Sequence, residues 1–261
     1  MANAAFKDFI VVVTGASTGL GRAIAVETAS QGANVVIVNY ASSTDEARET
    51  ARLVETQGAK AVLVQGDVAL DEDCRRVADA ARPYGRVDAL FNNAGVTVFA
   101  RHDNLDAISA EDFQKVYAVN VVGAFQMTRA CRELLEAAPQ TAAVVNTGSI
   151  ASIMGIGSSI AYAASKGALN TLTIALARAL APKVRVNAVL PGFIDTPWFG
   201  KALNLEQQAK QRRNAAEATP LKVASTAEDI AVSAVFLGGR HSRHVTGETL
   251  VVDAGRRLSA N

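Results

Sequence analysis

The chain has 261 residues, of which 49% are hydrophobic and 20% are charged, the composition of an ordinary globular protein. Its 26 basic and 25 acidic residues leave a formal net charge of +1, which argues against a broad nucleic-acid-binding surface. Two cysteines, Cys74 and Cys131, make no disulfide framework and indicate a reducing compartment. No apolar run is long enough to cross a membrane, no signal-peptide pattern is present, and the few Cys and His residues lack metal-ligand spacing. We therefore expect a cytoplasmic protein without a metal site, a nucleic-acid partner or a membrane partner.

Seven short apolar runs, rich in β-branched residues, recur along the chain without the polar–apolar alternation of a half-exposed strand. Such runs are typical of strands that are covered on both faces, as in a parallel sheet. The predicted strands are Ile10–Val13, Asn34–Val38, Ala61–Val64, Ala89–Phe91, Ala143–Asn146, Val184–Leu190 and Thr249–Val252.

Helical patterns separate these runs. The predicted helices are Gly21–Ser30, Thr44–Thr56, Asp71–Ala81, Ser109–Ala137, Ala161–Leu180 and Ala227–Leu237. Strands that alternate with helices predict βαβ units with right-handed crossovers. The expected fold class is therefore α/β, a doubly wound parallel sheet with helices on both faces, in one domain that spans residues 1–261.

One region, residues 192–222, interrupts this alternation. An interruption of this length in a compact domain is usually functional, so we expect it to form a substrate lid. Trp198 and Phe199 in this region either face the substrate or pack against the protein. Arg212 and Arg213 belong to a basic helical stretch, and we expect them to face solvent.

The first predicted strand runs directly into a glycine-rich turn, Thr14–Gly21 (TGASTGLG), and then into a helix. Glycines allow a tight turn and a close approach to a pyrophosphate, and the helix N-terminus supplies N–H donors. The GxxxGxG spacing differs from GxGxxG, and no Walker A lysine follows. A plain turn packed with small residues is the alternative, but the position after the first strand favours dinucleotide binding. The candidate ligands here are Gly15, Ser17, Thr18, Gly19, Leu20 and Gly21.

The end of the second predicted strand bears on the choice between NAD and NADP, because a carboxylate there binds the adenosine ribose and repels a 2′-phosphate. This chain carries Asn39, Tyr40 and Ser42 at that place, with neither a carboxylate nor an arginine. We therefore expect NADP(H) to be favoured over NAD(H), with hydrogen bonds from Asn39 and from the Ser42 and Ser43 hydroxyls. Asp67 follows the third strand and could accept a hydrogen bond from the adenine amino group, although a capping turn residue is the alternative.

Tyr162 and Lys166 are four residues apart in a predicted helix, so their side chains share one face. A nearby ammonium group favours phenolate and should lower the pKa of Tyr162 from about 10, which would make it a usable general acid and base. Ser149 follows the predicted strand 143–146, at the place where side chains point into the ligand crevice of a parallel sheet. A surface Tyr–Lys pair and a turn serine are the alternative when these residues are taken alone.

In their order and spacing, these motifs resemble those of short-chain dehydrogenases/reductases of the compact single-domain type, such as 3-oxoacyl-thioester reductases and glucose dehydrogenase-like members. The resemblance runs from about Lys7 to Ala254. The segments that carry it are Thr14–Gly21, Asn92–Gly95 (NNAG), Asn120 within VNV, Ser149 with Tyr162 and Lys166, and Pro191–Thr196 (PGFIDT). It implies a Rossmann-type fold and an oxidoreductase that transfers a hydride between a nicotinamide cofactor and a ketone or secondary alcohol.

The resemblance also implies a role for each residue. Ser149 and Tyr162 would hold and protonate the substrate oxygen, Lys166 would bind the nicotinamide ribose, and Asn120 would hold a water that links Lys166 to solvent. Thr196 and the backbone of Ile194 would orient the carboxamide. The cofactor contacts that it adds are Val68, Asn93, Ala94, Gly95, Pro191, Gly192, Ile194 and Thr196, beside Tyr162 and Lys166 themselves.

Two features depart from the family pattern. Gly148 precedes Ser149 where relatives often have a second serine, and residues 253–258 (DAGRRL) stand where relatives often carry Gly-Gly and an apolar ending. The resemblance implies a homotetramer that packs through helices 109–137 and 161–180. A catalytically idle dinucleotide-binding regulator on the same fold is the alternative function. The ketone or alcohol substrate itself is not identified.

Overall fold

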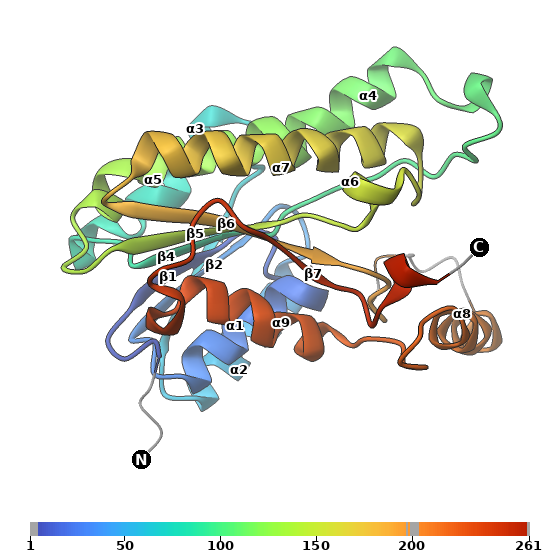
Figure 1. Ribbon diagram of the computed structural model, residues 1–261. Helices are drawn as coiled ribbons and strands as arrows, with labels where there is room; N and C mark the ends of the chain where they lie inside the picture. The colour runs from blue at the N-terminus through green and yellow to red at the C-terminus, as the bar shows by residue number, and fades with distance from the viewer. Residues whose placement is uncertain (1–4, 197, 199–203, 260–261) are drawn as a thin grey trace.

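The apolar runs of the sequence form a seven-stranded parallel sheet in the computed structural model, which describes residues 5–196, 198 and 204–259 (Figure 1). The strands are β1 (Ile10–Val13), β2 (Val35–Tyr40), β3 (Lys60–Gln65), β4 (Ala89–Asn92), β5 (Ala142–Thr147), β6 (Val184–Pro191) and β7 (Thr249–Val252). Their order in the sheet is β3-β2-β1-β4-β5-β6-β7. The predicted fold class, a doubly wound parallel sheet of the Rossmann type in a single domain, is confirmed.

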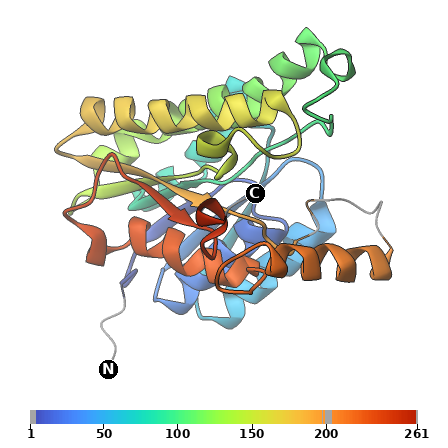
Figure 2. The same ribbon diagram turned by 45° about the vertical axis from the view of Figure 1, so that its right-hand side comes forward.

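Helices cover both faces of this sheet (Figures 1 and 2). One layer contains α1 (Gly19–Ser30), α2 (Thr44–Thr56) and α9 (Ala227–Gly238), and the opposite layer contains α3 (Asp71–Asp79), α4 (Ala110–Tyr117), α5 (Ala124–Glu136) and α7 (Ile160–Leu180). Among the described helices, none is both long enough and apolar enough to cross a bilayer.

The double cover explains why the strands are apolar at every position. Successive side chains of a strand point to opposite faces. Val11 and Val13 of β1 pack into the core beneath α1 and α9, whereas Ile10 and Val12 pack into the core beneath α5 and α7. All four residues are at most 3% exposed, so an alternating pattern would have buried polar groups.

The long helix that the sequence predicts over 109–137 is interrupted, and this prediction is wrong in that respect. Ser109 caps α4 by accepting from the Asp112 N–H, but a π-helical turn, η3 (Ala118–Gly123), separates α4 from α5. A Cβ at Gly123 would lie 2.8 Å from a Val68 methyl, so the chain passes close to the neighbouring loop at this turn. π-helical turns of this kind are frequent at functional sites.

The short α6 (Ala151–Met154), which follows β5, lies outside the predicted set. The basic helical stretch of the 192–222 region is part of α8 (Leu205–Glu217). Phe199, which the sequence offers as a substrate-facing residue of that region, lies outside the described residues, as do residues 197 and 200–203.

A buried amide network joins the middle of the sheet to the helices above it. Asn92 at the end of β4 donates to Asn146 Oδ1 in β5 at 2.9 Å and to Thr128 in α5 at 3.1 Å. Asn146 in turn donates to Thr173 in α7 at 2.9 Å. All four side chains are at most 5% exposed, so each hydrogen bond replaces one that water would otherwise provide. The network sets α7 relative to β4 and β5.

All seven strands end at the same edge of the sheet, because they are parallel. The connections diverge at β1, which lies between β2 and β4, and ligands of such sheets bind at this switch point. The Thr14 hydroxyl oxygen accepts from the N–H groups of Asn93 and Ala94, each at 3.0 Å, and so ties the ends of β1 and β4 together.

Candidate active site

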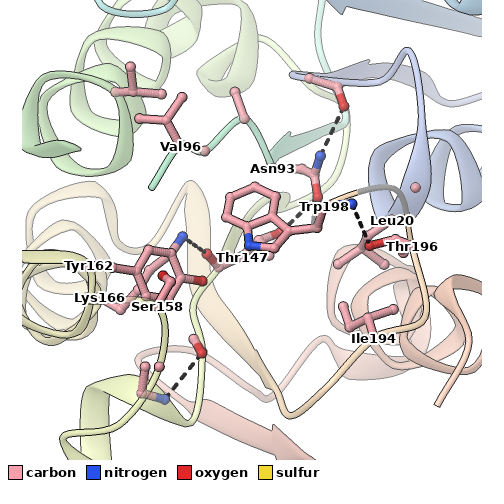
Figure 3. Close-up of a pocket in the computed structure, with 18 of the residues that line it drawn as sticks. Leu20, Asn93, Val96, Thr147, Ser158, Tyr162, Lys166, Ile194, Thr196 and Trp198 are labelled. Carbon is pink, nitrogen blue, oxygen red and sulfur yellow. Dashed lines mark hydrogen bonds between the residues drawn. The ribbon is translucent and has the colours of Figure 1, made fainter. Parts of the chain in front are cut away.

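A cavity of about 1500 Å³ lies at this edge and extends from Ser42 to Ser158 (Figure 3). Most of the predicted site residues line it: Gly15, Ser17, Thr18, Gly19, Leu20, Asn39, Ser42, Asp67, Val68, Asn93, Ala94, Gly95, Ser149, Tyr162, Lys166, Pro191, Gly192, Ile194 and Thr196. Gly21, Tyr40 and Asn120 do not line it. The volume exceeds the range of about 300–1000 Å³ that is usual for one ligand, so it can hold two molecules together.

The glycine-rich turn is shaped as a phosphate cradle. Gly15 and Gly19 have φ angles of +59° and +55°, which favour glycine. Thr18 stands at the N-cap position of α1, but its side chain makes no capping hydrogen bond. Thr18, Gly19 and Leu20 all line the cavity. The first N–H groups of α1 therefore have no side-chain cap to satisfy them, as an anion site at a helix N-terminus requires.

Gly21 has a packing role in place of the predicted ligand role. A Cβ at this position would lie 2.3 Å from the Gly15 carbonyl oxygen and 2.5 Å from Asn93 Nδ2. Asn93 is itself used as a brace, because its amide donates to the carbonyl oxygens of Thr14 and Gly15, each at 3.1 Å. Together, these contacts hold the turn in place beside the cavity.

The prediction that Asn39 binds a 2′-phosphate is wrong for its side chain. The amide is 1% exposed, donates to the carbonyl oxygens of Gly66 (2.9 Å) and Val64 (3.3 Å), and accepts from the Gly15 N–H (3.4 Å). These backbone groups would be unsatisfied without it, so Asn39 joins the glycine turn to β3. Tyr40 is 8% exposed and does not line the cavity.

The three residues after β2, namely Ala41, Ser42 and Ser43, also line the cavity. Ser43 is the N-cap of α2, but its side chain makes no capping hydrogen bond. Asp67 lines the cavity, and its carboxylate also accepts from the Ala69 N–H at 2.9 Å. Asp67 is therefore both a turn residue and a residue placed to contact a ligand.

The Ser–Tyr–Lys group assembles from two elements. Ser149 follows β5, whereas Tyr162 and Lys166 lie on one face of α7. Ser159 begins this helix by accepting from the Tyr162 N–H at 3.2 Å. The Ser149 hydroxyl is close enough to the Tyr162 phenol to lower its pKa, and Lys166 Nζ lies 5.6 Å from the centre of the Tyr162 ring. The three residues that sequence spacing selects all line the cavity. Figure 3 shows Tyr162 and Lys166 side by side.

The electrostatics of this group differ from the prediction. Burial raises the pKa of Tyr162 to about 12, and the nearby Ser149 hydroxyl lowers it by less. Lys166 is 3% exposed, and burial lowers its own pKa to about 8. Its ammonium group donates to the Thr147 carbonyl oxygen at 2.7 Å and lies against the ring. The cost of desolvating a phenolate therefore outweighs the expected effect of Lys166 on the pKa of Tyr162.

Asn120 lies behind the cavity wall, within the π-helical turn. Its Oδ1 accepts from the Val96 N–H at 2.8 Å, and its Nδ2 donates to the Val96 carbonyl oxygen and to Ser165 Oγ, each at 3.0 Å. The side chain is 1% exposed and braces the loop after Gly95. The predicted contact between Asn120 and a water on Lys166 therefore does not involve a free side-chain group that faces the cavity.

The PGFIDT segment closes the opposite wall. Ile194 pairs with Ser225 in a parallel bridge, and the Asp195 N–H donates to the Ser225 carbonyl oxygen at 2.9 Å. Arg212 of α8 faces solvent as predicted, with its side chain 64% exposed, and it also forms an ion pair with Asp195. A Cβ at Gly19 would lie 3.4 Å from Thr196 Cβ, which shows how closely this segment approaches the glycine turn.

The far end of the cavity combines broad apolar side chains with the polar residues Arg101, His102 and Asp103, which follow Phe99. Trp198 lies 6.1 Å from Tyr162 between ring centres, at 56° between planes, and faces the cavity (Figure 3). The other apolar side chains at this end are Val96, Phe99, Ile150, Ile156 and Phe193. Two hydroxyls, Thr97 Oγ1 and Ser158 Oγ, meet at 2.5 Å beside it.

Sequence reasoning missed several of these residues. Thr147 could have been found, because it ends β5 at the same edge as Ser149. Ala41 directly follows β2, and the same rule applies to it. Ser158 and Thr97 belong to loops without a recurring pattern, so nothing in the sequence pointed to their contact.

Comparisons with known proteins agree with this geometry. The family model described as Enoyl-(Acyl carrier protein) reductase matches residues 15–257. The chain is 38% identical, over 259 residues, to a protein assigned as ketoacyl reductase 2 of the granaticin polyketide synthase of Streptomyces violaceoruber, and the match covers 99% of this chain and 100% of the relative. It is 37% identical to 3beta-hydroxysteroid dehydrogenase 1 of Eggerthella lenta, with 97% and 95% covered. A short chain dehydrogenase from Burkholderia cenocepacia, solved in complex with NADP, superposes with a TM-score of 0.85 at 29% identity and covers 97% of this chain and 99% of its own.

The burial of Lys166 predicts a trade-off between stability and site chemistry. Replacing Lys166 with Met should raise the free energy of unfolding at pH 7 by about 1–3 kcal/mol, because the folded chain no longer holds a desolvated ammonium group. Between pH 8 and 10.5 the unfolded wild type binds more protons at this site than the folded protein does, so its stability rises and the advantage of Lys166→Met disappears. Urea unfolding at pH 7 and pH 10.5 measures both values.

Lys222→Met is the matched control, because exposed Lys222 donates to the Glu217 carbonyl oxygen at 2.8 Å without being buried. It should change stability by less than about 0.5 kcal/mol at both pH values. An advantage of Lys166→Met that stays the same from pH 7 to pH 10.5 would contradict the burial argument.

Proposed function

This chain belongs to the short-chain dehydrogenase/reductase family, and on that premise we propose that Ser149, Tyr162 and Lys166 carry its reaction. The family membership makes it an oxidoreductase that acts on alcohol or ketone groups with a nicotinamide cofactor. The observation that supports the assignment is that Ser149, Tyr162 and the buried Lys166 line one cavity, with Lys166 Nζ 5.6 Å from the centre of the Tyr162 ring.

Ser149 is the donor that stabilises charge on the substrate oxygen. Its Oγ accepts from the Ala151 N–H at 3.1 Å, so the hydroxyl proton is free to point toward Tyr162 and the substrate. A donor that is already aimed at a developing oxyanion costs no reorganisation when the reaction occurs. The site is buried, which strengthens this interaction.

Tyr162 is the general acid in ketone reduction and the general base in alcohol oxidation. With its pKa raised to about 12, the phenol is protonated at neutral pH and ready to donate its proton to the substrate oxygen. Alcohol oxidation needs the phenolate, so we expect its rate to rise with pH while reduction proceeds at neutral pH.

Lys166 holds positive charge beside the phenol and the cofactor ribose. With a pKa of about 8 it is mostly protonated at neutral pH, and one of its three donors is held by Thr147. The remaining donors are available to ribose hydroxyls.

The cavity fits a dinucleotide cofactor. The uncapped α1 N-terminus and Gly15–Gly19 would hold the pyrophosphate, Ala41–Ser43 the adenosine end, and Ile194 and Thr196 the nicotinamide end. When bound, this cofactor supplies or accepts the hydride at the carbonyl carbon. All other steps are positioning and proton transfer by the side chains described above.

We propose a preference for NADP(H) over NAD(H). No carboxylate lines the adenosine end next to β2 in the described part of the chain, and the Ser42 and Ser43 hydroxyls lie there instead. A negative charge at this place is the usual means of excluding a 2′-phosphate. The solved relative in complex with NADP supports the same choice.

The apolar side chains at the far end favour a hydrophobic ketone. Trp198, Phe99 and Phe193 offer broad apolar surfaces that suit a hydrophobic ketone, and Arg101, His102 and Asp103 are the polar side chains that line the cavity beside Phe99. We also propose that the 192–222 region, through Phe193 and Trp198, covers this end.

We further propose a cytoplasmic homotetramer. The outward surfaces of η3, α5 and α7 carry apolar side chains, with Val122 45%, Phe125 39% and Ile174 42% exposed. Side chains of this kind become buried when subunits pack helix against helix. Cys74 and Cys131 are free and buried, which is consistent with a reducing compartment.

Replacing Tyr162 with Phe should lower turnover by about 10²–10⁴-fold, because the acid and base function is lost while the ring remains. The assay follows nicotinamide absorbance over a panel of an aryl ketone, a cyclic ketone, a 3-oxoacyl thioester and an aldose. Tyr84→Phe is the control and should keep full turnover, because Tyr84 precedes β4 and so lies at the edge of the sheet opposite the cavity. A Tyr162→Phe enzyme with more than about a tenth of wild-type turnover would refute the assignment, and cofactor binding without turnover by the wild type would favour the regulator.

For cofactor choice, wild-type kcat/KM should be higher with NADPH than with NADH. Ala41→Asp should reduce the NADPH value at least about tenfold relative to the NADH value, because its carboxylate repels the 2′-phosphate. Ala41→Asn adds nearly the same volume without charge and should leave the ratio close to that of wild type. A wild-type preference for NADH would overturn the proposal.

For assembly, light scattering should give a mass of about four times 27.2 kDa. Ile174→Glu should lower this mass, because it places a charge in the proposed α7 contact. Leu63→Glu is the control, since Leu63 is 37% exposed on the edge strand β3, and its neighbours Val62 and Val64 are the residues that face the α5 and α7 side of the sheet. A wild-type monomer would contradict the proposal.

A further inference from the structure

A chain of side-chain hydrogen bonds runs from α7 to Ser149. Asn170 Nδ2 lies 2.8 Å from Ser152 Oγ, and Ser152 Oγ lies 2.6 Å from the Ser149 carbonyl oxygen. Asn170 belongs to α7, one turn after Lys166, and Ser152 belongs to the short helix α6. None of the proposed catalytic steps uses either residue.

The direction of this chain follows from the chemistry of its members. The Ser149 carbonyl can only accept, so the Ser152 hydroxyl must donate to it. The Ser152 oxygen is then free to accept, and Asn170 must present its NH₂ group. This orientation leaves Asn170 Oδ1 buried without a partner in the described part of the chain. A buried acceptor without a partner is destabilising, so the Asn170 amide lowers the stability of the folded protein at this position.

The same short segment is held at several other points. The N–H groups of Gly148 and Ile150 donate to β6 carbonyl oxygens at 2.8 and 2.9 Å, and the Ser152 N–H donates to the Ser149 carbonyl oxygen at 3.0 Å. The β6 contacts set the height of the segment above the sheet. The Ser152 hydroxyl connects it to Asn170 of α7, the helix that carries Tyr162 and Lys166.

We propose that Asn170 and Ser152 are positioning residues that fix the Ser149 peptide, and with it the Ser149 hydroxyl, relative to Tyr162. The inference rests on the proposed role of Ser149 in catalysis. Hydrogen bonds in such a chain polarise one another, so the loss of either donor weakens the hold on Ser149. Tyr162, Lys166 and Ser149 are then oriented by one rigid helix.

The test begins with Ser152→Ala and Asn170→Leu in the full chain, assayed with the best ketone of the panel. Each should lower kcat by about three- to tenfold, the effect of losing one neutral hydrogen bond, with little change in KM or in cofactor affinity. Ser152→Thr keeps the hydroxyl and should restore kcat to near wild type. Ser30→Ala is the matched control, because exposed Ser30 makes the same serine-to-carbonyl bond, to Glu27 at 2.9 Å, far from the cavity.

The second step repeats Ser152→Ala in a Ser149→Ala background, with thermal unfolding recorded for every variant. If Ser152 acts through Ser149, it should cause no further loss of kcat there, whereas a merely structural role would lower the melting temperature and add its loss in both backgrounds. Additive losses, or full kcat in Ser152→Ala while Ser149→Ala is impaired, would overturn the inference and leave the proposed function intact. Full activity in Ser149→Ala would overturn both.

Discussion

A parallel sheet that is covered by helices on both faces leaves the edge at its strand ends open to ligands, and every functional feature of this protein depends on that edge. The glycine turn follows β1, the adenosine-end residues follow β2, Ser149 follows β5, and the PGFIDT segment follows β6. Thr14 ties the β1 and β4 ends together and keeps the switch point in one shape. The cavity is therefore a consequence of strand direction and order, and the loops supply its chemistry.

Asparagines carry much of the precision at this edge. Asn39, Asn93 and Asn120 each connect two backbone segments with one amide, and each therefore satisfies donors and acceptors that leave the regular ladder. An amide suits this task because it offers an acceptor and two donors without charge. Asn39 and Asn93 hold the glycine turn through hydrogen bonds to Gly15, and Asn120 holds the loop after Gly95 through Val96.

The Tyr–Lys pair is costly to hold. Burial raises the pKa of Tyr162 and lowers that of Lys166, so both groups are driven toward their neutral forms. The carbonyl oxygen of Thr147 is the protein's direct compensation for the lysine. Sites that combine burial with titratable groups in this way exchange stability for function. The fold tolerates the exchange because two large cores flank the sheet.

The sequence by itself determined the fold class, the strands to within about two residues, and the neighbours Ser149, Tyr162 and Lys166. These depend on local periodicity, on the position of residues relative to strand ends, and on the i,i+4 spacing of a helix. Only the tertiary structure decided that Asn39 and Tyr40 turn inward, that helix 109–137 breaks at a π-helical turn, that Arg212 meets Asp195, and that the pKa of Tyr162 is raised. Each of these outcomes depends on burial or on contacts between residues far apart in the chain. Local pattern carries no information about such contacts, because they form only when the strands and helices pack.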